Sequence, residues 1–404
     1  MDITTRFQIV FLCAASVAAA PPLRTDRHMI AELGGPNTRA EVAFSPDGKW
    51  LLATACEEGA KFASVVTKWD VRTGKALARF PFQRDIPVFK LAVSPSGKAF
   101  AASDSRGKVF VCDSTTGKIR CSYKQSENDG WTVALLTFLD EDHVFSVDGD
   151  GIGLKRNTRD KDTKIYRIGK PSELGAVTLS PRGRLLAFTD KSHLHLRGMD
   201  LGRDLLSLDL DLGGGRGFAV TDDGAYAMAS DDSTGLLLYD LKGEKLIVGW
   251  QGHDSVERKK PARKGGVIYM IPDPKTKKIV EWRQVQEGEE VADDEKFRIV
   301  NPQTGNALVL RKIPDSEKGE DFVNCVVQIA ALPGRNVFVT SDRLGFIRFW
   351  NAKGKRLAEV RRHPRSVSTL AVSPDGKILA TSGTDQPIVL WDLEKILQAG
   401  DGAK

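Results

Sequence analysis

The sequence predicts an all-β fold of repeated four-stranded units that close into a ring, a β-propeller. One observation is an alternating apolar strand followed by a Ser-Pro-Asp/Ser-Gly turn, nearly identical at 42–49, 91–98 and 370–377. A second phrase, an apolar strand with Trp-Asp or a close variant and then a Gly-Lys turn, runs in step with the first. The 38 glycines, against 18 prolines, fit a fold rich in tight turns. Four short strands per unit of about 40–45 residues are typical of a propeller blade.

The copies of the first phrase give the number of blades. Looser or degenerate copies follow at 136–145, 177–184, 218–224, 267–280 and 329–335. Where neighbouring turns are both well formed, their glycines are about one blade apart, as with Gly183 and Gly224 or Gly334 and Gly376. The sequence therefore predicts eight four-stranded blades. Seven is the alternative, if the sixth unit is an insertion.

The ends of the repeat array predict how the ring closes. The last unit stops at Asp392-Leu393, so it lacks an outermost strand, while an unassigned apolar segment, Met29 to Leu33, precedes the first unit. We expect this N-terminal strand to complete the last blade, because that buries an otherwise unpaired sheet edge. The predicted organisation is a signal peptide at 1–20, one propeller at 21–395 and a disordered tail at 396–404.

The repeats resemble the WD-repeat family over residues 28–393, with Trp-Asp dipeptides at Trp69 and Trp391 and a Gly-His pair at His253. The closest type is an exported bacterial WD-repeat protein. The resemblance implies a buried hydrogen-bond network of His, Ser or Thr, Asp and Trp in each blade. Only the last unit matches it residue by residue, with His363, Ser382, Asp385 and Trp391. We interpret these residues as structural and not as a catalytic triad, because a Ser within a strand lacks the exposed turn that a nucleophile needs.

The N-terminal segment predicts export. Phe7 to Ala20 is an apolar, small-residue run that is too short to span a bilayer, and cleavage after Ala18 or Ala19 fits its small residues. The chain is then periplasmic or secreted. A cytoplasmic protein with an uncleaved leader is the alternative. We predict no membrane span elsewhere.

Charge and cysteines limit the chemistry. The net charge of +6 is mild and does not favour nucleic acid as a partner. Cys112 and Cys121 flank a Ser-Thr-Thr-Gly-Lys turn, which would place them opposite one another in a hairpin. This arrangement allows a cross-strand disulfide, and two free thiols are the alternative. No cysteine or histidine spacing indicates a metal site, and no motif indicates a cofactor.

Two loops remain as candidate binding elements. A basic, proline-interrupted stretch is a candidate docking loop through Arg258, Lys259, Lys260, Arg263 and Lys264. An acidic run follows at 287–295. The segment 147–151 resembles the start of a calcium loop, but Arg159 stands where the bidentate Glu would be, so we expect a tight turn there instead. The glycine run 213–217 lacks the following helix of a phosphate site.

These observations favour a non-catalytic protein-interaction scaffold, a monomeric ring without a cofactor. Its partners would bind at the loops of one face or at the mouth of the central channel. The alternative is a hydrolase- or lactonase-like propeller enzyme with a carboxylate or metal site in the channel. Three or more His, Asp or Glu side chains converging at the channel mouth would favour that alternative.

Overall fold

The computed structural model describes residues 28–37, 41–56, 63–82, 86–125, 132–160, 162–169, 174–190, 193–202, 204–209, 217–231, 235–243, 245–250, 299–300, 307–308, 326–383 and 386–401. Several predicted features lie outside these ranges. They are the signal peptide, the basic docking loop, the acidic run, all but the last residue of the glycine run, and Asp385.

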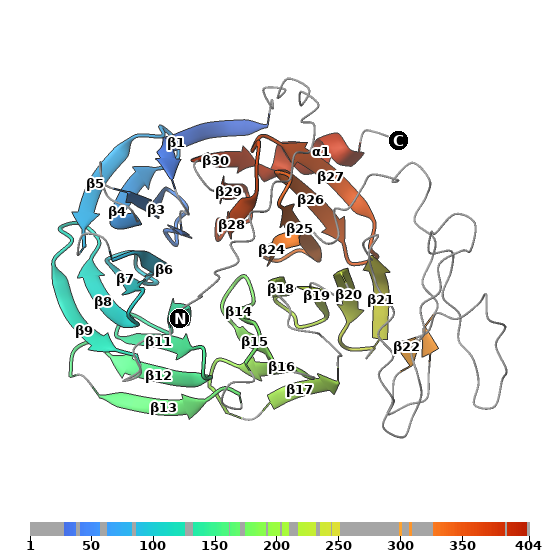
Figure 1. Cartoon of the computed structure of the whole chain (residues 1–404), viewed down its shortest axis with the longest axis horizontal. Helices are drawn as coiled ribbons and strands as arrows, with labels where there is room; N and C mark the ends of the chain where they lie inside the picture. Colours follow the sequence, from blue (N-terminus) through green and yellow to red (C-terminus); the bar gives the residue numbers. More distant parts are fainter. Residues whose placement is uncertain are drawn as a thin grey trace, which may run out of the picture.

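Within the described residues, seven four-stranded antiparallel sheets stand around a central axis as the blades of a propeller (Figure 1). In the first four blades the strands pair in chain order, from an inner to an outer strand. Blade 1 contains β2 (Val42–Phe44), β3 (Trp50–Cys56), β4 (Ala63–Asp70) and β5 (Ala76–Pro81). Blade 2 contains β6 (Val88–Val93), β7 (Ala99–Asp104), β8 (Lys108–Asp113) and β9 (Ile119–Lys124). Blade 3 contains β10 (Val133–Phe138), β11 (His143–Asp148), β12 (Ile152–Asn157) and β13 (Thr163–Arg167). Blade 4 contains β14 (Val177–Leu179), β15 (Leu185–Thr189), β16 (His193–Gly198) and β17 (Asp204–Asp209).

The other three blades complete the ring. Blade 5 contains β18 (Gly217–Val220), β19 (Tyr226–Asp231), β20 (Gly235–Asp240) and β21 (Lys245–Trp250). Blade 6 contains β24 (Val326–Ala331), β25 (Val337–Asp342), β26 (Phe346–Asn351) and β27 (Arg356–Arg361). Blade 7 contains β28 (Val367–Val372), β29 (Ile378–Gly383), β30 (Gln386–Asp392) and, as its outer strand, β1 (Met29–Asn37).

Blade 7 joins the two ends of the propeller. β1 pairs antiparallel with β30, with Met29 opposite Trp391 and Leu33 opposite Ile388. Leu33 is fully buried in a cluster that also contains side chains of blade 1. The backbone amide of Asp392 donates a hydrogen bond to the carbonyl of His28 at 2.9 Å. The prediction that the N-terminal strand completes the last blade is confirmed.

The ring has seven blades, the alternative number, and not eight. The inner strands β18 and β24 are neighbours, and Met228 of blade 5 packs in one buried cluster with Phe338 and Trp350 of blade 6. This direct packing leaves no place for a blade between them. The chain from β21 to β24 holds a two-stranded sheet of β22 (Ile299–Val300) and β23 (Ala307–Leu308), which lies outside the ring beside β21 (Figure 1).

The first repeated phrase forms the turn between the first and second strands of a blade. In blade 1, the Ser45 hydroxyl donates to Asp47 at 2.7 Å, and the amide of Trp50 donates to Ser45 Oγ at 3.1 Å. Gly48 takes a φ of 68°, which costs glycine little. Ser373 and Asp375 repeat the contact in blade 7. The phrase is thus a self-contained turn, which explains why it recurs.

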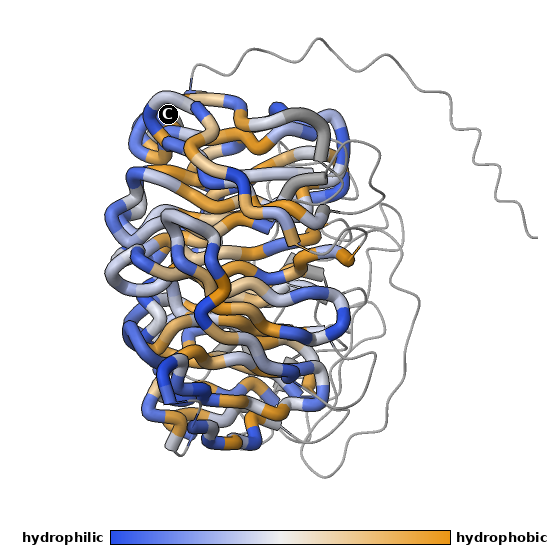
Figure 2. The backbone as a smooth tube through the Cα atoms, turned by 90° about the vertical axis from the view of Figure 1, so that its left-hand side faces the viewer, coloured by the Kyte–Doolittle hydropathy of each residue, from blue (hydrophilic) through white to orange (hydrophobic). Residues whose placement is uncertain are grey.

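The core lies between the faces of neighbouring blades, where hydrophobic strands stack and hydrophilic turns line the edges (Figure 2). A helix, α1 (Leu393–Asp401), follows β30 and packs Leu393 and Ile396 into the same cluster as Trp391. The Asp392 carboxylate caps it by accepting the amide of Lys395 at 3.0 Å. The expected disordered tail is therefore corrected to a helix as far as Asp401. Among the described residues, no helix has the length and apolarity to cross a membrane.

Candidate functional site

A buried hydrogen-bond network ties blade 7 together. The Trp391 indole Nε1 donates to Thr381 Oγ1 at 2.8 Å, and His363 Nε2 lies 2.8 Å from the same hydroxyl oxygen. His363 Nδ1 lies 2.5 Å from Gln386 Oε1. Because the amide oxygen only accepts, Nδ1 carries the proton and Nε2 accepts the hydroxyl of Thr381. Burial lowers the pKa of His363 to about 4, so its imidazole is neutral near pH 7.

The hydroxyl in this network is that of Thr381, and Ser382 was the wrong residue of the pair. Leu379 lies opposite Trp391 in the sheet, so Thr381, two residues along β29, shares the face of the indole. Ser382 is on the other face, since a shift of one residue along a strand reverses the side chain. Thr381 is fully buried, which supports a structural role for the network.

Blade 6 repeats the indole–hydroxyl contact but adds buried charges. Trp350 Nε1 donates to Thr340 Oγ1 at 2.9 Å. Opposite Thr340 stands Arg348. Its Nη1 lies 2.5 Å from Asp342 Oδ2, and its Nε lies 2.7 Å from Glu359 Oε2. Asp342 is 1% exposed and Arg348 8%. Sequence reasoning missed this ion network. The available signal was the phrase Asp-x-x-Gly, which blade 6 shares with blades 2 and 3.

That phrase forms the turn between the second and third strands. Asp104 Oδ1 accepts the amides of Arg106 and Lys108, both at 2.9 Å. Asp148 accepts the amides of Asp150 and Ile152 in the same way, at 3.0 and 2.9 Å. The segment that resembles a calcium loop is therefore the tight turn that we expected. Its carboxylate is used to close the hairpin.

The cysteines do not face each other. A bulge in the β8–β9 hairpin places Ile119 opposite Cys112, and Cys121 opposite Val111. Cys112 is buried against blade 1, whereas Cys121 packs toward blade 3, and no disulfide joins them. Burial raises the pKa of the Cys112 thiol to about 12. The disulfide that the spacing allowed is therefore not formed, because the two side chains lie on opposite faces of the sheet.

The central channel opens at the face formed by the Ser-Pro-x-Gly turns. A cavity of about 680 Å³ is lined there by inner strands of blades 1, 3, 4 and 7 and by turns of blades 2 and 4. Its walls are apolar or carry hydroxyls, as at Phe138, Thr178 and Val372, and Arg182 is the charged residue among the described lining residues. No His, Asp or Glu is among those lining residues, and no described cluster of His, Cys, Asp or Glu could hold a metal ion. The described lining residues of this cavity thus do not include the group of three His, Asp or Glu side chains that would favour the enzyme alternative.

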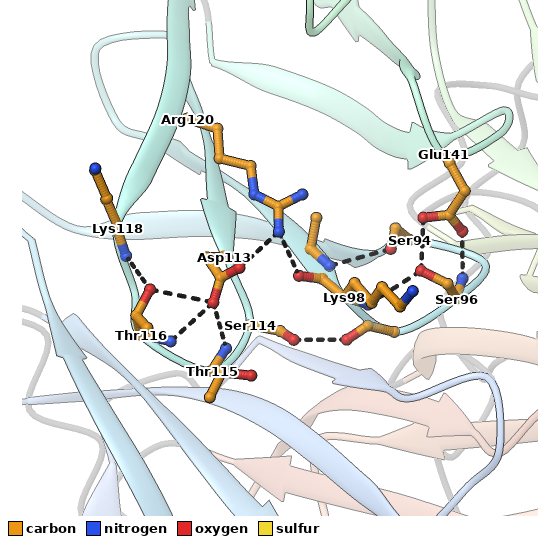
Figure 3. Close-up of polar contacts among 12 residues, drawn as sticks. Ser94, Ser96, Lys98, Asp113, Ser114, Thr115, Thr116, Lys118, Arg120 and Glu141 are labelled. Atoms are coloured by element: carbon orange, nitrogen blue, oxygen red, sulfur yellow. Dashed lines mark hydrogen bonds and ion pairs between the residues drawn. The ribbon is translucent and has the colours of Figure 1, made fainter.

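Contacts between neighbouring turns hold the channel mouth together. Asp222 of blade 5 accepts the amide of Arg182 in blade 4 at 2.7 Å and that of Gly334 in blade 6 at 2.9 Å. Between blades 2 and 3, the Ser96 hydroxyl donates to Glu141 at 2.6 Å, and the Ser96 amide donates to the same carboxylate (Figure 3). Side chains thus link the turns of successive blades around much of the mouth.

A second carboxylate with several partners, that of Asp113, lies beside the contact between Ser96 and Glu141 (Figure 3). Asp113 accepts the amides of Thr115 and Thr116 and lies 2.6 Å from the Arg120 guanidinium, which also donates to the carbonyl of Lys98 at 3.0 Å (Figure 3). The Arg120 hydrogen bond and the two amides hold the pKa of Asp113 well below its usual range. Through Arg120, the contact joins the two turns of blade 2 that lie on the channel-mouth face.

A ring of four-stranded blades with indole–hydroxyl contacts, one of them completed by a neutral histidine, defines a propeller of the WD-repeat class. Residues 354–392 match the family model described as WD domain, G-beta repeat. Over 181 residues, 40% of the chain, the sequence is 27% identical to WD repeat-containing protein 91 of Gallus gallus. Over 70 residues, 17% of the chain, it is 37% identical to Mitotic checkpoint protein BUB3.1 of Arabidopsis thaliana.

The chain spans 24% of the length of the first relative and 21% of the second. The fold, the network and these similarities agree. They support a WD-repeat β-propeller, with the repeat itself matched at residues 354–392. Propellers of this family commonly serve as protein-interaction scaffolds.

Proposed function

We propose that this protein is a non-catalytic scaffold that binds a partner protein at the channel mouth on the Ser-Pro-x-Gly face. The observation that carries the proposal is the lining of that mouth, where apolar and hydroxyl side chains surround a cavity and Arg182 stands at its rim. Protein interfaces likewise combine apolar and polar surface in one patch.

The links between turns support the same proposal. Asp222 joins three successive blades, and Glu141 joins two, so the mouth keeps its shape before a partner arrives. A preformed surface loses little conformational entropy on binding, which favours affinity.

A bulky cation in the mouth tests the proposal. Thr178→Arg should abolish capture of the partner from the native host, because Thr178 lines the cavity. Ile165→Arg, which places the same side chain on an exposed position of the outer strand β13, should leave capture unchanged. Cross-links between partner and bait, mapped by mass spectrometry, should lie on the Ser-Pro-x-Gly face. Equal capture by both variants, or no partner above a mock bait, would overturn the proposal.

We also propose that residues 1–20 direct export to the periplasm or out of the cell. The apolar run of Phe7 to Ala20 and its small-residue end support this. N-terminal sequencing of the native protein should show a chain that begins at Ala19 or Ala20. An intact leader on protein from the cytoplasmic fraction would contradict it.

A further inference from the structure

The outer rim of the propeller carries a second concave surface, between blades 1 and 2. This rim groove has a volume of about 1020 Å³. It lies between the end of β5 and the face of the β8–β9 hairpin that is turned toward blade 1. Lys108 lies opposite Lys124, and Phe110 opposite Ser122, so these four residues share one face of blade 2. Phe110 packs with side chains of blade 1, which shows that this face looks into the groove.

The groove is cationic. Arg79, Arg106, Lys108 and Lys124 are exposed and line it. The acidic lining residue, Asp104, is 7% exposed and its carboxylate already accepts two backbone amides. Within the described residues, no carboxylate forms an ion pair with Arg79, Arg106 or Lys108. These three side chains therefore offer positive charge that no described carboxylate of the chain pairs with.

Blade 6 carries a carboxylate at the position that Ser122 occupies in blade 2. In the β26–β27 hairpin, Glu359 occupies the register position of Ser122, opposite Arg348. Glu359 lies 2.7 Å from Arg348 and 3.1 Å from Arg356. In blade 2, Ser122 stands where blade 6 has Glu359, and Phe110 and Ile119 stand where it has Arg348 and Arg356. The blade 2 face thus has no carboxylate of its own at the Ser122 position, and its exposed cation Lys108 lies two residues from Phe110 on the same face.

The aromatic residues of the groove favour a peptide over a nucleic acid. Phe82 packs edge-on against Phe110, with ring centroids 5.4 Å apart. The Lys108 ammonium covers a face of Phe110 at 5.1 Å from its centroid. A stacking platform for bases needs an open ring face, which Phe110 does not present. Small apolar side chains, in contrast, can pack along these ring edges.

We propose that the rim groove binds an acidic segment of a partner protein, with a carboxylate placed where blade 6 holds Glu359 and an apolar side chain against Phe82 and Phe110. The inference deepens the proposed scaffold function but uses a surface separate from the channel mouth. Charge complementarity supports this occupant, since carboxylates pair with Lys and Arg in directed hydrogen bonds.

Fluorescence anisotropy with the full chain tests the inference. The probe is a fluorescein-labelled ten-residue peptide of glutamates with two leucines. The wild-type protein should bind it more tightly than the matching glutamine peptide, and added salt should weaken the binding. Ser122→Glu places a carboxylate on the face of Lys108 and Lys124, where it competes with the peptide, and should weaken binding by about tenfold or more. The double variant Arg79→Ser with Lys108→Ser, which changes only exposed side chains, should do the same.

Matched controls make the outcome decisive. Ser207→Glu makes the same change on the outer strand of blade 4 and should bind the peptide as the wild type does. Thermal melting should show that all variants are folded. Equal binding of the glutamate and glutamine peptides, no effect of either groove variant, or tighter binding of oligothymidine would overturn the inference. Thr178→Arg should keep peptide binding, so loss of the groove and loss of the channel-mouth scaffold are separate results.

Discussion

Blades 6 and 7 are neighbours, and they satisfy the buried polar groups around a tryptophan in two different ways. Both bury a tryptophan whose indole donates to a threonine two residues from its cross-strand neighbour, at 2.9 Å in blade 6 and 2.8 Å in blade 7. In blade 7 the threonine then meets the neutral His363, and Val389 stands opposite Thr381. In blade 6 the position opposite the threonine belongs to Arg348, which is paired with two carboxylates.

The difference shows which part of a repeated blade is constrained. The indole–hydroxyl contact depends only on two strands in register, so it survives in both blades. The remaining buried polar groups need partners, but either a neutral imidazole or an ion network satisfies them. Blade 7 also depends on both ends of the chain, whereas blade 6 is one continuous segment. The two blades should therefore fail under different changes.

Removing residues 28–35 should have the largest effect. The deletion takes away most of β1, Leu33 included, opens the outer edge of blade 7 and exposes Ile388. We expect the melting temperature to fall by about 10 °C or more, or the ring to lose cooperative unfolding. A chain that begins at residue 28 is the control. Equal melting temperatures for the two chains would show that the N-terminal strand does not hold the ring.

Arg348→Met should be the most damaging single change in blade 6. It leaves Asp342, which is 1% exposed, as an uncompensated buried charge. Loss of one partner from a buried ion pair costs about 3–5 kcal/mol of unfolding free energy. Urea denaturation measures the change. Glu359→Gln, at a partly exposed position, should cost about 1 kcal/mol or less, and an equal loss in both variants would contradict the assignment.

Sequence reasoning reached the features that depend on local chemistry. Turn phrases such as Ser45 to Gly48 fix their own geometry, and the orphan strand around Leu33 had one open edge to fill. It missed features that depend on register. Thr381 and Ser382 are equally good hydroxyls in the sequence, and only the pairing of Leu379 with Trp391 selects between them. The bulge that separates Cys112 from Cys121 is likewise invisible in the spacing.

Contacts between blades were harder still to predict from the sequence. The apolar segments after residue 267 fit the pattern of strands in the sequence. The packing of Met228 against Phe338, however, leaves no room in the ring for an eighth blade. From the sequence alone, Arg348 resembles an exposed strand residue, because Asp342 and Glu359 become its neighbours only in the folded sheet. The rim groove belongs to two blades at once, so no single repeat contains its pattern.

Acid should separate blade 7 from blade 6. The folded pKa of His363 is about 4 against 6.5 for an ordinary histidine, because the imidazole is buried. Between these values the unfolded chain binds a proton that the folded chain does not, so stability falls as pH falls through this window. The full loss is about 3 kcal/mol and is complete below pH 4.

Urea denaturation at about pH 7 and at pH values down to 4 measures this loss. His363→Gln removes the titrating group, so its unfolding free energy should change less across the window than that of the wild type. Arg348→Met should keep the full dependence on His363, although it is less stable at every pH. Parallel curves for the wild type and His363→Gln would contradict the role of the imidazole.

The smallest expected effects compare the two threonines directly. Thr381→Val removes the acceptor of the Trp391 indole and the donor to His363, which is two hydrogen bonds, whereas Thr340→Val removes one. Because a buried polar group that loses its partner costs about 1–3 kcal/mol, Thr381→Val should lose about 2 kcal/mol and Thr340→Val about 1 kcal/mol. Valine keeps the volume and the β-branched shape, so the difference reports hydrogen bonding and not packing. In the His363→Gln background the excess loss at Thr381 should shrink. If it does not, the imidazole contributes nothing through that hydroxyl, and the two blades are equivalent at their common contact.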